Sequence, residues 1–267
     1  MTATTTDSAL EIRGITKAFD LGGGRSVTAV KDINFAVERN SICVLLGPSG
    51  CGKSTILRMM AGLETPTSGE IFIGGRTVDG PGRDRGMVFQ AYTSFDWLTV
   101  RKNVEFGMDI NGVAPAERRE RADRFIKLVG LGKFADAYPS QLSGGMRQRV
   151  AIARTLANDP EVLLMDEPFG ALDAETRWLM QELMIDVAEK TNTTMVIVTH
   201  DLEEAIFLAD KIVFLSSHPG RVKEEIVPAF KQGHRIGDKE RAVKLDGYAE
   251  LESHLMRLMR EEGRGAE

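Results

Sequence analysis

The fold of this chain is decided by one stretch, Gly47-Pro48-Ser49-Gly50-Cys51-Gly52-Lys53-Ser54-Thr55. It fits the phosphate-loop pattern G-x-x-x-x-G-K-[S/T]. The apolar run 42–46 precedes it and predicts a buried parallel strand, while residues 54–61 have a helical pattern. A glycine-rich turn between a strand and a helix is the alternative interpretation. The matched strand–loop–helix context favours the phosphate loop.

Each residue type in the stretch suits the binding of nucleotide phosphates. Gly50 and Gly52 allow the backbone to curl so that its N–H groups face phosphate oxygens. The helix that follows adds the positive end of its dipole. Lys53 is expected to reach the β- and γ-phosphates as a point charge, and the Ser54 hydroxyl to bind Mg²⁺. We therefore expect ATP and Mg²⁺ as cofactors.

Composition limits the class of protein. The 267 residues are 42% hydrophobic, which suits one large α/β domain with an insertion or a short tail. The net charge of −5 argues against a general nucleic-acid binder. Residues 1–8 lack the apolar segment of a signal peptide, and no apolar run approaches the ~18 residues that span a membrane. Cys43 and Cys51 are expected to be free thiols in a reducing compartment.

Periodicity places the remaining elements. Residues 20–26 hold three consecutive glycines and are expected to be flexible, and Asn40 is expected to tolerate a left-handed backbone. The strand at 211–215 is expected to be the last of the core. Strands are predicted at 10–19, 33–37, 70–73, 86–90, 161–165, 195–199 and 211–215.

Residues 93–158 show helical periodicity and are interpreted as an inserted subdomain. Within it, Ser143-Gly144-Gly145 precedes a helix predicted at about 146–157, which offers a second N-terminus suited to an anion. Beyond residue 228 the chain is more polar. An apolar stripe there predicts a C-terminal helix packed on the body; it comprises Tyr248, Leu251, Leu255 and Leu258.

Three polar residues follow predicted buried strands. Asp166 ends an apolar strand and is a candidate to hold Mg²⁺ through water, and Glu167 beside it can act as general base on the attacking water. His200 ends the strand at 195–199. A lone histidine is more often structural, but here it falls where ligands bind in open α/β sheets.

Together these motifs resemble those of the ATP-binding subunits of ABC transporters, over about residues 10–227. The phosphate loop matches at 47–55, the signature sequence at Leu142–Met146 and the Walker B segment at 162–166. The resemblance assigns the Q-loop to Gln90, which also contacts Mg²⁺, the catalytic base to Glu167, the D-loop to 171–173 and the switch histidine to His200. Phe19 is the candidate to stack on adenine.

The resemblance implies a fold and a domain plan. It is the P-loop NTPase fold of ABC ATPases, with a mainly parallel central sheet, an N-terminal antiparallel β subdomain and an inserted helical subdomain. Residues 1–227 would form the ATPase domain, with the insertion at about 93–158, and residues 228–267 a helical tail. Met146 departs from the usual signature glutamine, a change that is not expected to abolish activity because Ser143-Gly144-Gly145 is intact, and Asn40 departs from the usual glycine.

Several residues keep a structural alternative. Phe19 is a core or surface aromatic if it does not meet adenine, and Gln90 is otherwise an ordinary polar strand end. Asp173 can be the N-cap of the following helix as well as a D-loop residue. Cys51, beside Lys53 and backbone N–H groups, is expected to have a reactive thiolate.

The resemblance also implies partners and location. We expect a homodimer with ATP at the interface, Ser143, Gly144 and Gly145 of one chain facing the nucleotide of the other. Two integral membrane permease subunits and, indirectly, a periplasmic or lipoprotein solute-binding protein would complete an importer at the cytoplasmic face of the membrane. Segments 96–104 and 218–221 resemble the nitrate/sulfonate/taurine branch. Rival classes are an ABC ATPase acting on nucleic acid or ribosomes and a small-molecule kinase or GTPase.

Overall fold

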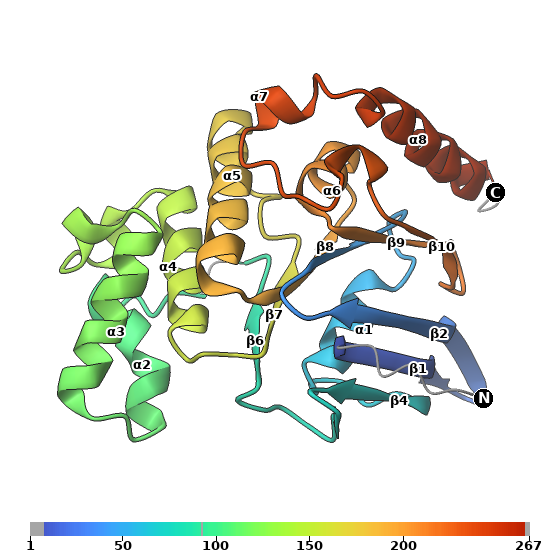
Figure 1. The fold of residues 1–267 in the computed structure, drawn as a ribbon. Helices are drawn as coiled ribbons and strands as arrows, with labels where there is room; N and C mark the ends of the chain where they lie inside the picture. Colours follow the sequence, from blue (N-terminus) through green and yellow to red (C-terminus); the bar gives the residue numbers. More distant parts are fainter. Residues whose placement is uncertain (1–7, 92, 265–267) are drawn as a thin grey trace.

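Two β-sheets form the framework of the computed structural model, which describes residues 8–91 and 93–264 (Figure 1). The first sheet is antiparallel, with strand order β2-β1-β4-β5. Its strands are β1 Ser8–Gly22, β2 Arg25–Glu38, β4 Ser68–Ile73 and β5 Arg76–Thr77. The expectation that residues 1–8 carry no signal segment concerns residues that lie, except for Ser8, outside the described part of the chain.

The second sheet is mainly parallel, with strand order β10-β9-β3-β8-β7-β6. Only the pair β10–β9 is antiparallel. Its strands are β3 Ile42–Leu46, β6 Arg85–Val88, β7 Val162–Asp166, β8 Thr194–Thr199, β9 Lys211–Leu215 and β10 Val222–Ile226. The carboxyl ends of five strands therefore meet at one edge of this sheet, where parallel α/β sheets bind ligands.

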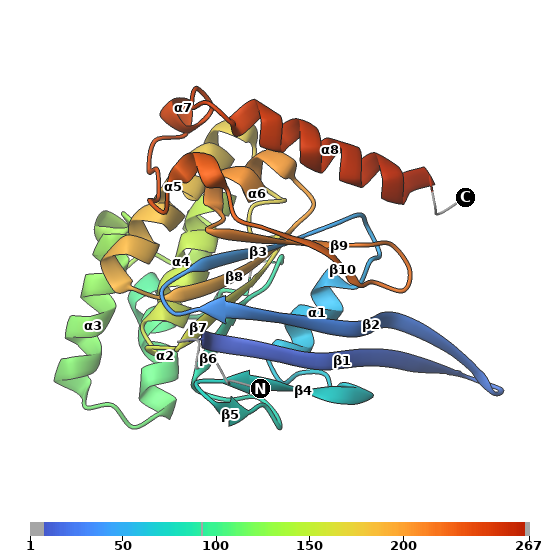
Figure 2. The same cartoon turned by 45° about the vertical axis from the view of Figure 1, so that its right-hand side comes forward.

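The helices occupy distinct places around the sheets. In Figures 1 and 2, α2 to α4 gather at one end of the molecule, and α8 runs along the opposite part beside β9 and β10. The α-helices are α1 Lys53–Met60, α2 Val100–Ile110, α3 Pro115–Leu128, α4 Gly144–Leu156, α5 Ala174–Thr191, α6 Leu202–Leu208, α7 Lys239–Ala242 and α8 Tyr248–Arg264. Short 3-10 turns lie at Gly132–Phe134, Pro139–Gln141 and Ala229–Lys231.

Strand β3 separates two hydrophobic cores. Ile42, Val44 and Leu46 pack into a core shared with the helices on one face of the parallel sheet. Cys43 and Leu45 point to the other face, into a core shared with α1 and the antiparallel sheet. All five side chains are fully buried, as a continuous apolar run predicts for a central parallel strand. The start of α1 is thus fixed between two packed layers.

The glycine-rich stretch 20–26 is not a flexible loop. Strand β1 continues to Gly22, which pairs with Arg25 at the start of β2, so the stretch closes a β-hairpin. Gly23 and Gly24 have φ values of 64° and 74°, the positive range that tight hairpin turns require. The three glycines therefore build a turn. The expected left-handed backbone of Asn40 is confirmed, with φ 58°.

Several boundaries differ from the sequence-based prediction. Strand β2 begins at Arg25 rather than at residue 33, and β6 ends at Val88 rather than at Gln90. Strand β9 is not the last of the core, because β10 pairs with it antiparallel. Lys223, Glu224 and Glu225 within β10 hide its strand character. The first helix after residue 93 begins only at Val100, and α4 begins at Gly144 rather than at about residue 146. The C-terminal helix is confirmed as α8, whose Tyr248, Leu255 and Leu258 are buried.

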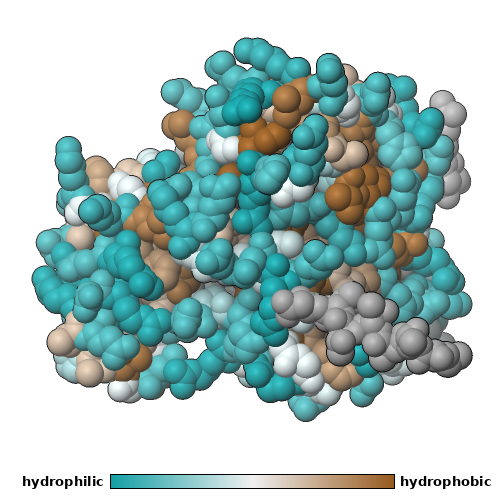
Figure 3. Space-filling model, viewed as in Figure 1, coloured by the Kyte–Doolittle hydropathy of each residue, from teal (hydrophilic) through white to brown (hydrophobic). Residues whose placement is uncertain are grey.

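The surface is largely hydrophilic. On the face shown in Figure 3, hydrophilic residues dominate and apolar residues form small, separate patches. None of the helices in residues 8–91 and 93–264 combines the length and the apolar character needed to cross a lipid bilayer.

Candidate functional site

The parallel sheet brings several predicted residues to one edge. The phosphate loop begins at Gly47, directly after β3. Asp166 ends β7, and His200 follows the last residue of β8. Gln90 lies two residues beyond the end of β6. These side chains come from four neighbouring strands, which explains how positions far apart in sequence meet in one site.

Lys53 is held inside the phosphate loop. Its Nζ donates hydrogen bonds to the carbonyl oxygens of Gly47 at 2.7 Å and Pro48 at 2.8 Å. The side chain is almost fully buried, and its two acceptors fix the ammonium at the mouth of the loop. A buried ammonium needs several acceptors, because an unpaired charge away from water is costly. Its third donor contacts Cys51 Sγ at 3.7 Å, a weak acceptor that a phosphate oxygen can replace.

The N-terminus of α1 suits an anion. Its N-cap is Gly52, with φ 94°, which provides no side chain to cap the first turn. The amides of that turn and the helix dipole can therefore act on a phosphate. A Cβ at residue 52 would collide with the Val30 side chain of β2, and one at Gly47 would lie 2.7 Å from the Leu215 carbonyl oxygen. Glycine is thus required at both ends of the loop for packing.

Ser54 and Asp166 form the candidate metal site. The Ser54 hydroxyl donates to Asp166 Oδ1 at 2.8 Å, and Asp166 is buried. Hydroxyl and carboxylate oxygens are the ligands that Mg²⁺ prefers. Within the described residues there is no cluster of three or more His, Cys, Asp or Glu side chains able to hold a metal. The residues fit a Mg²⁺ ion that takes its other ligands from phosphate and water.

Glu167 meets two of the other predicted residues. His200 Nδ1 lies 3.2 Å from Glu167 Oε2, and Gln90 Nε2 lies 3.5 Å from the same oxygen. Glu167 has φ 43°, a left-handed backbone that is unusual for this residue type. Its amide donates to the Val198 carbonyl at 3.0 Å, which holds the unusual conformation. Such conformations concentrate at functional sites, where the surrounding structure fixes them.

A second, buried carboxyl follows His200 by four residues. Glu204 is buried in the first turn of α6, the helix that follows His200. Burial, together with the charge of Asp201, raises the pKa of Glu204 to about 8. Burial thus favours the neutral form of this carboxyl.

The signature segment, Leu142–Met146, leads into a helix whose N-terminus, unlike that of α1, is capped by a side chain. Ser143 is the N-cap of α4, and its Oγ accepts from the Met146 amide at 3.3 Å. Gly145 packs against Thr176 of α5, leaving no room for a Cβ. Asp173 caps α5 by accepting from the Thr176 amide at 2.9 Å, and this hydrogen bond lowers the pKa of the Asp173 carboxyl. The helix-capping interpretation of Asp173 is confirmed.

The two helix N-termini are not brought together. Helix α1 belongs to the core shared with the antiparallel sheet, whereas α4 belongs to the helical core on the other face. In both Figure 1 and Figure 2 they lie apart. Phe19 lies on β1, partly exposed, with Lys17 Nζ 4.9 Å from its ring centroid. Its stacking on adenine stays a prediction.

The prediction of a reactive Cys51 is wrong. The thiol is buried, and burial raises its pKa although Lys53 opposes the shift. The thiolate, which is the reactive form, is therefore disfavoured. Cys43 is fully buried, and its pKa is raised to about 12. Sequence proximity to Lys53 indicated the attraction but not the burial, which depends on how the chain packs around the loop.

Comparison with known proteins identifies the family. Residues 30–170 match the model of the family described as ABC transporter. The chain belongs to the ABC transporter family. This ABC protein is 51% identical over 217 residues to the nitrate import ATP-binding protein NrtD of Synechocystis, covering 81% of each chain. It is 40% identical over 252 residues to the taurine import ATP-binding protein TauB of Ruegeria pomeroyi, covering 94% of each.

A solved structure supports the same assignment. The ABC protein shares a TM-score of 0.71 and 34% identity with a dimeric ATP-binding cassette in a post-hydrolysis state bound to ADP and phosphate. The match covers 82% of this chain and 98% of the other. The P-loop ABC ATPase fold is therefore confirmed, and this chain is an ABC ATPase of the importer type, in the branch that includes nitrate and taurine systems. Sequence reasoning did not anticipate the turn 216–221, which packs against the phosphate loop.

Proposed function

We propose that this ABC protein binds MgATP at the edge of the parallel sheet where β3, β6, β7 and β8 end. Hydrolysis of that ATP powers the import of a small anion such as nitrate, a sulfonate or taurine. The observation that carries the proposal is the Glu167 carboxylate, which lies within 3.5 Å of Gln90 and His200 and directly follows the Mg²⁺ candidate Asp166. The names of the NrtD and TauB relatives support the class of solute.

The residues divide the chemistry between them. Lys53 and the first-turn amides of α1 bind the phosphates, and Ser49, Gly50 and Thr55 complete the loop. Ser54 and Asp166 hold Mg²⁺, with Gln90 as a further oxygen ligand; the ion, when bound, offsets phosphate charge. Glu167 accepts the proton of the attacking water. His200 orients that water and the γ-phosphate, and Phe19 stacks on adenine.

Assembly completes the proposal. Residues 1–227 act as the ATPase domain, and Ser143, Gly144, Gly145 and Asp173 face the nucleotide of a second copy. ATP then bridges a two-fold homodimer with two composite sites. Gln90 and the helical segment 93–158 transmit closure to two integral membrane permease subunits, and a solute-binding protein delivers the solute from the other side. The protein lies at the cytoplasmic face of the membrane. Residues 228–267 form a helical tail.

The test is a single conservative substitution. Glu167→Gln keeps the shape of the side chain and the contact with Gln90 and His200, but removes the base. MgATP binding should persist, while turnover should fall by about 10²- to 10⁴-fold. Equilibrium binding and steady-state phosphate release measure the two quantities. Full turnover in Glu167→Gln would exclude Glu167 from the mechanism.

A second measurement addresses the transport role. The full chain, expressed in its native membrane background and purified by affinity, should bring with it hydrophobic integral membrane proteins. Reconstitution of that complex with the solute-binding protein, and with nitrate, taurine or an alkyl sulfonate in turn, then identifies the solute by stimulated ATP turnover. Stimulation by none of the three anions, in a complex that hydrolyses ATP, would contradict the proposed solute class.

A further inference from the structure

The turn between β9 and β10 lies along the phosphate loop. A Cβ at Gly220 would collide with the Cys51 carbonyl oxygen, and one at Gly50 would lie 4.0 Å from His218 Nε2. At the start of the turn, the Leu215 carbonyl lies against Gly47. Residues 215–220 therefore form an outer wall against which the phosphate loop rests. A shift of this wall would change the path of the loop backbone, because an added Cβ would not fit between Gly220 and Cys51 or between Gly47 and Leu215.

The base of the turn is fixed to β2. The Gly220 amide donates to the Ala29 carbonyl at 2.9 Å, and the Lys31 amide donates to the Gly220 carbonyl at 2.9 Å. The Ser216 amide donates to the Arg221 carbonyl at 2.9 Å, which closes the turn on itself. These hydrogen bonds hold the ends of the turn but leave its apex, Ser217 to Pro219, to be held by other contacts.

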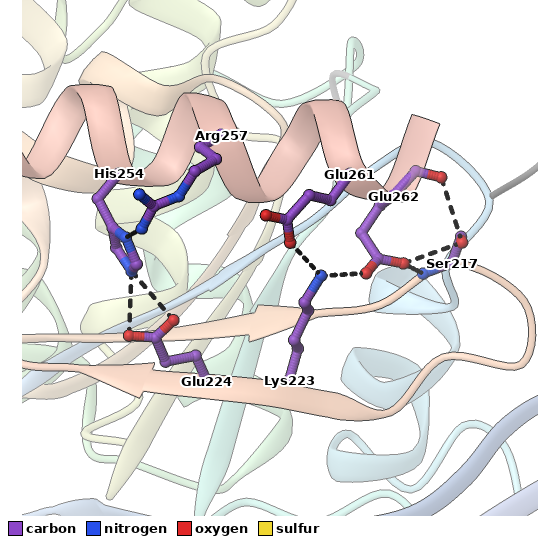
Figure 4. Close-up of polar contacts among 7 residues, drawn as sticks. All are labelled: Ser217, Lys223, Glu224, His254, Arg257, Glu261 and Glu262. Carbon is purple, nitrogen blue, oxygen red and sulfur yellow. Dashed lines mark hydrogen bonds and ion pairs between the residues drawn. The ribbon is translucent and has the colours of Figure 1, made fainter. Parts of the chain in front are cut away.

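Glu262 of α8 holds that apex (Figure 4). The Ser217 amide donates to Glu262 Oε2 at 2.7 Å, and the Ser217 hydroxyl donates to the same oxygen at 3.0 Å. Glu262 also accepts from Lys223 Nζ at 2.6 Å. Its side chain is only 13% exposed, so these hydrogen bonds are largely shielded from water. Burial alone would raise the pKa of Glu262, but the hydrogen bonds from Lys223 and Ser217 lower it.

The position of Glu262 in the helix is unusual for a carboxylate. It lies in the last turn of α8, where the helix dipole disfavours a negative charge. The helix does not need this residue in order to dock. Tyr248, Leu255 and Leu258 are buried against the helical core, and His254 Nε2 lies 3.0 Å from the Glu224 carboxylate on β10. The Ser217 contact therefore adds to a helix that is already anchored.

The neighbouring residue provides a matched comparison. Glu261 accepts from Lys223 Nζ at 3.0 Å, as Glu262 does, and both belong to the same helical turn. Among the described contacts of α8, however, Glu262 is the one that reaches Ser217. Figure 4 shows this division: Glu261 points to Lys223, whereas Glu262 lies between Lys223 and Ser217. The two glutamates thus share the docking role and differ in their contact with the turn.

We propose that Glu262 is a positioning residue for the phosphate loop: by holding Ser217 it keeps the apex of the 216–221 turn, with His218, beside Gly50, so that the docked C-terminal helix increases nucleotide affinity. The inference rests on the proposed binding of ATP at this loop. It gives the C-terminal tail a function in the nucleotide site, although α8 contributes no group to the phosphates. Release of the end of α8 would then weaken nucleotide binding without altering the catalytic groups.

The test compares Glu262→Ala with Glu261→Ala in the full chain. Calorimetric titration with MgADP measures affinity without turnover, and ATPase kinetics separate KM from kcat. Loss of the hydrogen bonds to Ser217 should raise the MgADP Kd and the ATP KM of Glu262→Ala by about three- to tenfold, with kcat within twofold of wild type. Glu261→Ala should stay within about twofold of wild type. Glu262→Gln keeps an acceptor for the Ser217 amide and should recover most of the affinity.

Three outcomes decide the matter. Wild-type affinity in Glu262→Ala would overturn the proposal, and so would an equal loss in Glu261→Ala, which would mean that only docking of α8 matters. Thermal unfolding of both variants detects a general loss of stability, and the Ser217→Ala variant then tests the contact from the side of the turn. Failure of the wild-type chain to bind MgADP would instead refute nucleotide binding at this loop.

Discussion

The N-termini of α1 and α4 are both glycine-rich starts of helices, but they are built differently. Helix α1 begins after Gly52, has no side-chain cap, and lies beside the buried Lys53 and Asp166. Helix α4 begins after Ser143, an exposed residue whose own hydroxyl accepts from the Met146 amide. The first N-terminus belongs to a cluster of catalytic candidates. The second is capped by its own serine and faces outward.

This difference agrees with the proposal that the start of α1 binds the nucleotide and that the start of α4 contacts the nucleotide of a second copy. Phosphate binding needs donors, a cation and carboxylates that hold a metal, and the edge near α1 collects these from one chain. The α4 start offers a hydroxyl and helix amides, which is enough to contact a phosphate that is already held elsewhere. In the proposed dimer, the start of α1 would hold the nucleotide and the start of α4 of a second copy would contact it.

The largest effect is expected from a substitution that disrupts only the phosphate site at α1. Lys53→Ala removes a buried cation and leaves the Gly47 and Pro48 carbonyls without their donor. MgATP affinity should fall by about 10- to 100-fold or more, the range of a lost charge-assisted hydrogen bond to phosphate. Equilibrium binding measures it, with exposed Lys133→Ala as the control. Unchanged affinity in Lys53→Ala would mean that the nucleotide binds away from this loop.

The sequence predicts the residues of the first site better than it predicts the contacts between them. The phosphate loop, Asp166 and Glu167 can be predicted because their contexts are local: the loop and Glu167 directly follow an apolar strand, and Asp166 ends one. The geometry between them required the sheet, since the Ser54–Asp166 hydrogen bond joins residues 112 positions apart. The path of the chain after β9 decides two further features: the packing of Gly220 against Cys51 and the hydrogen bonds between Ser217 and Glu262. Local periodicity carries no information about such contacts.

An intermediate effect is expected from a substitution that disrupts only the start of α4. In the Glu167→Gln background with saturating MgATP, Ser143→Arg should prevent dimerisation while the monomer still binds ATP. The larger cation would replace the small hydroxyl at the start of α4, where a partner's nucleotide is expected to fit. Light scattering after size exclusion measures the mass, MgADP should not support the dimer, and Ser68→Arg on β4 is the control for an added charge.

Two results of the dimerisation experiment would contradict this expectation, for different reasons. A dimer that persists in Ser143→Arg would place the interface away from α4. A Glu167→Gln chain that stays monomeric even before the second substitution would mean either that the permease subunits are needed or that the composite site is wrong. Repeating the measurement with the membrane partners present decides between these two explanations.

The smallest expected effect tests which part of the α4 start matters. Met146 stands where the family usually has glutamine; its amide donates to Ser143, and its side chain packs partly against the helical core. If the second site works through Ser143 and backbone amides, Met146→Gln should leave ATP turnover within about twofold and cost about 1 kcal/mol or less of stability, from the lost apolar packing. Steady-state turnover and thermal unfolding measure these. A tenfold change in turnover, with the fold intact, would show that the side chain at 146 reaches the nucleotide.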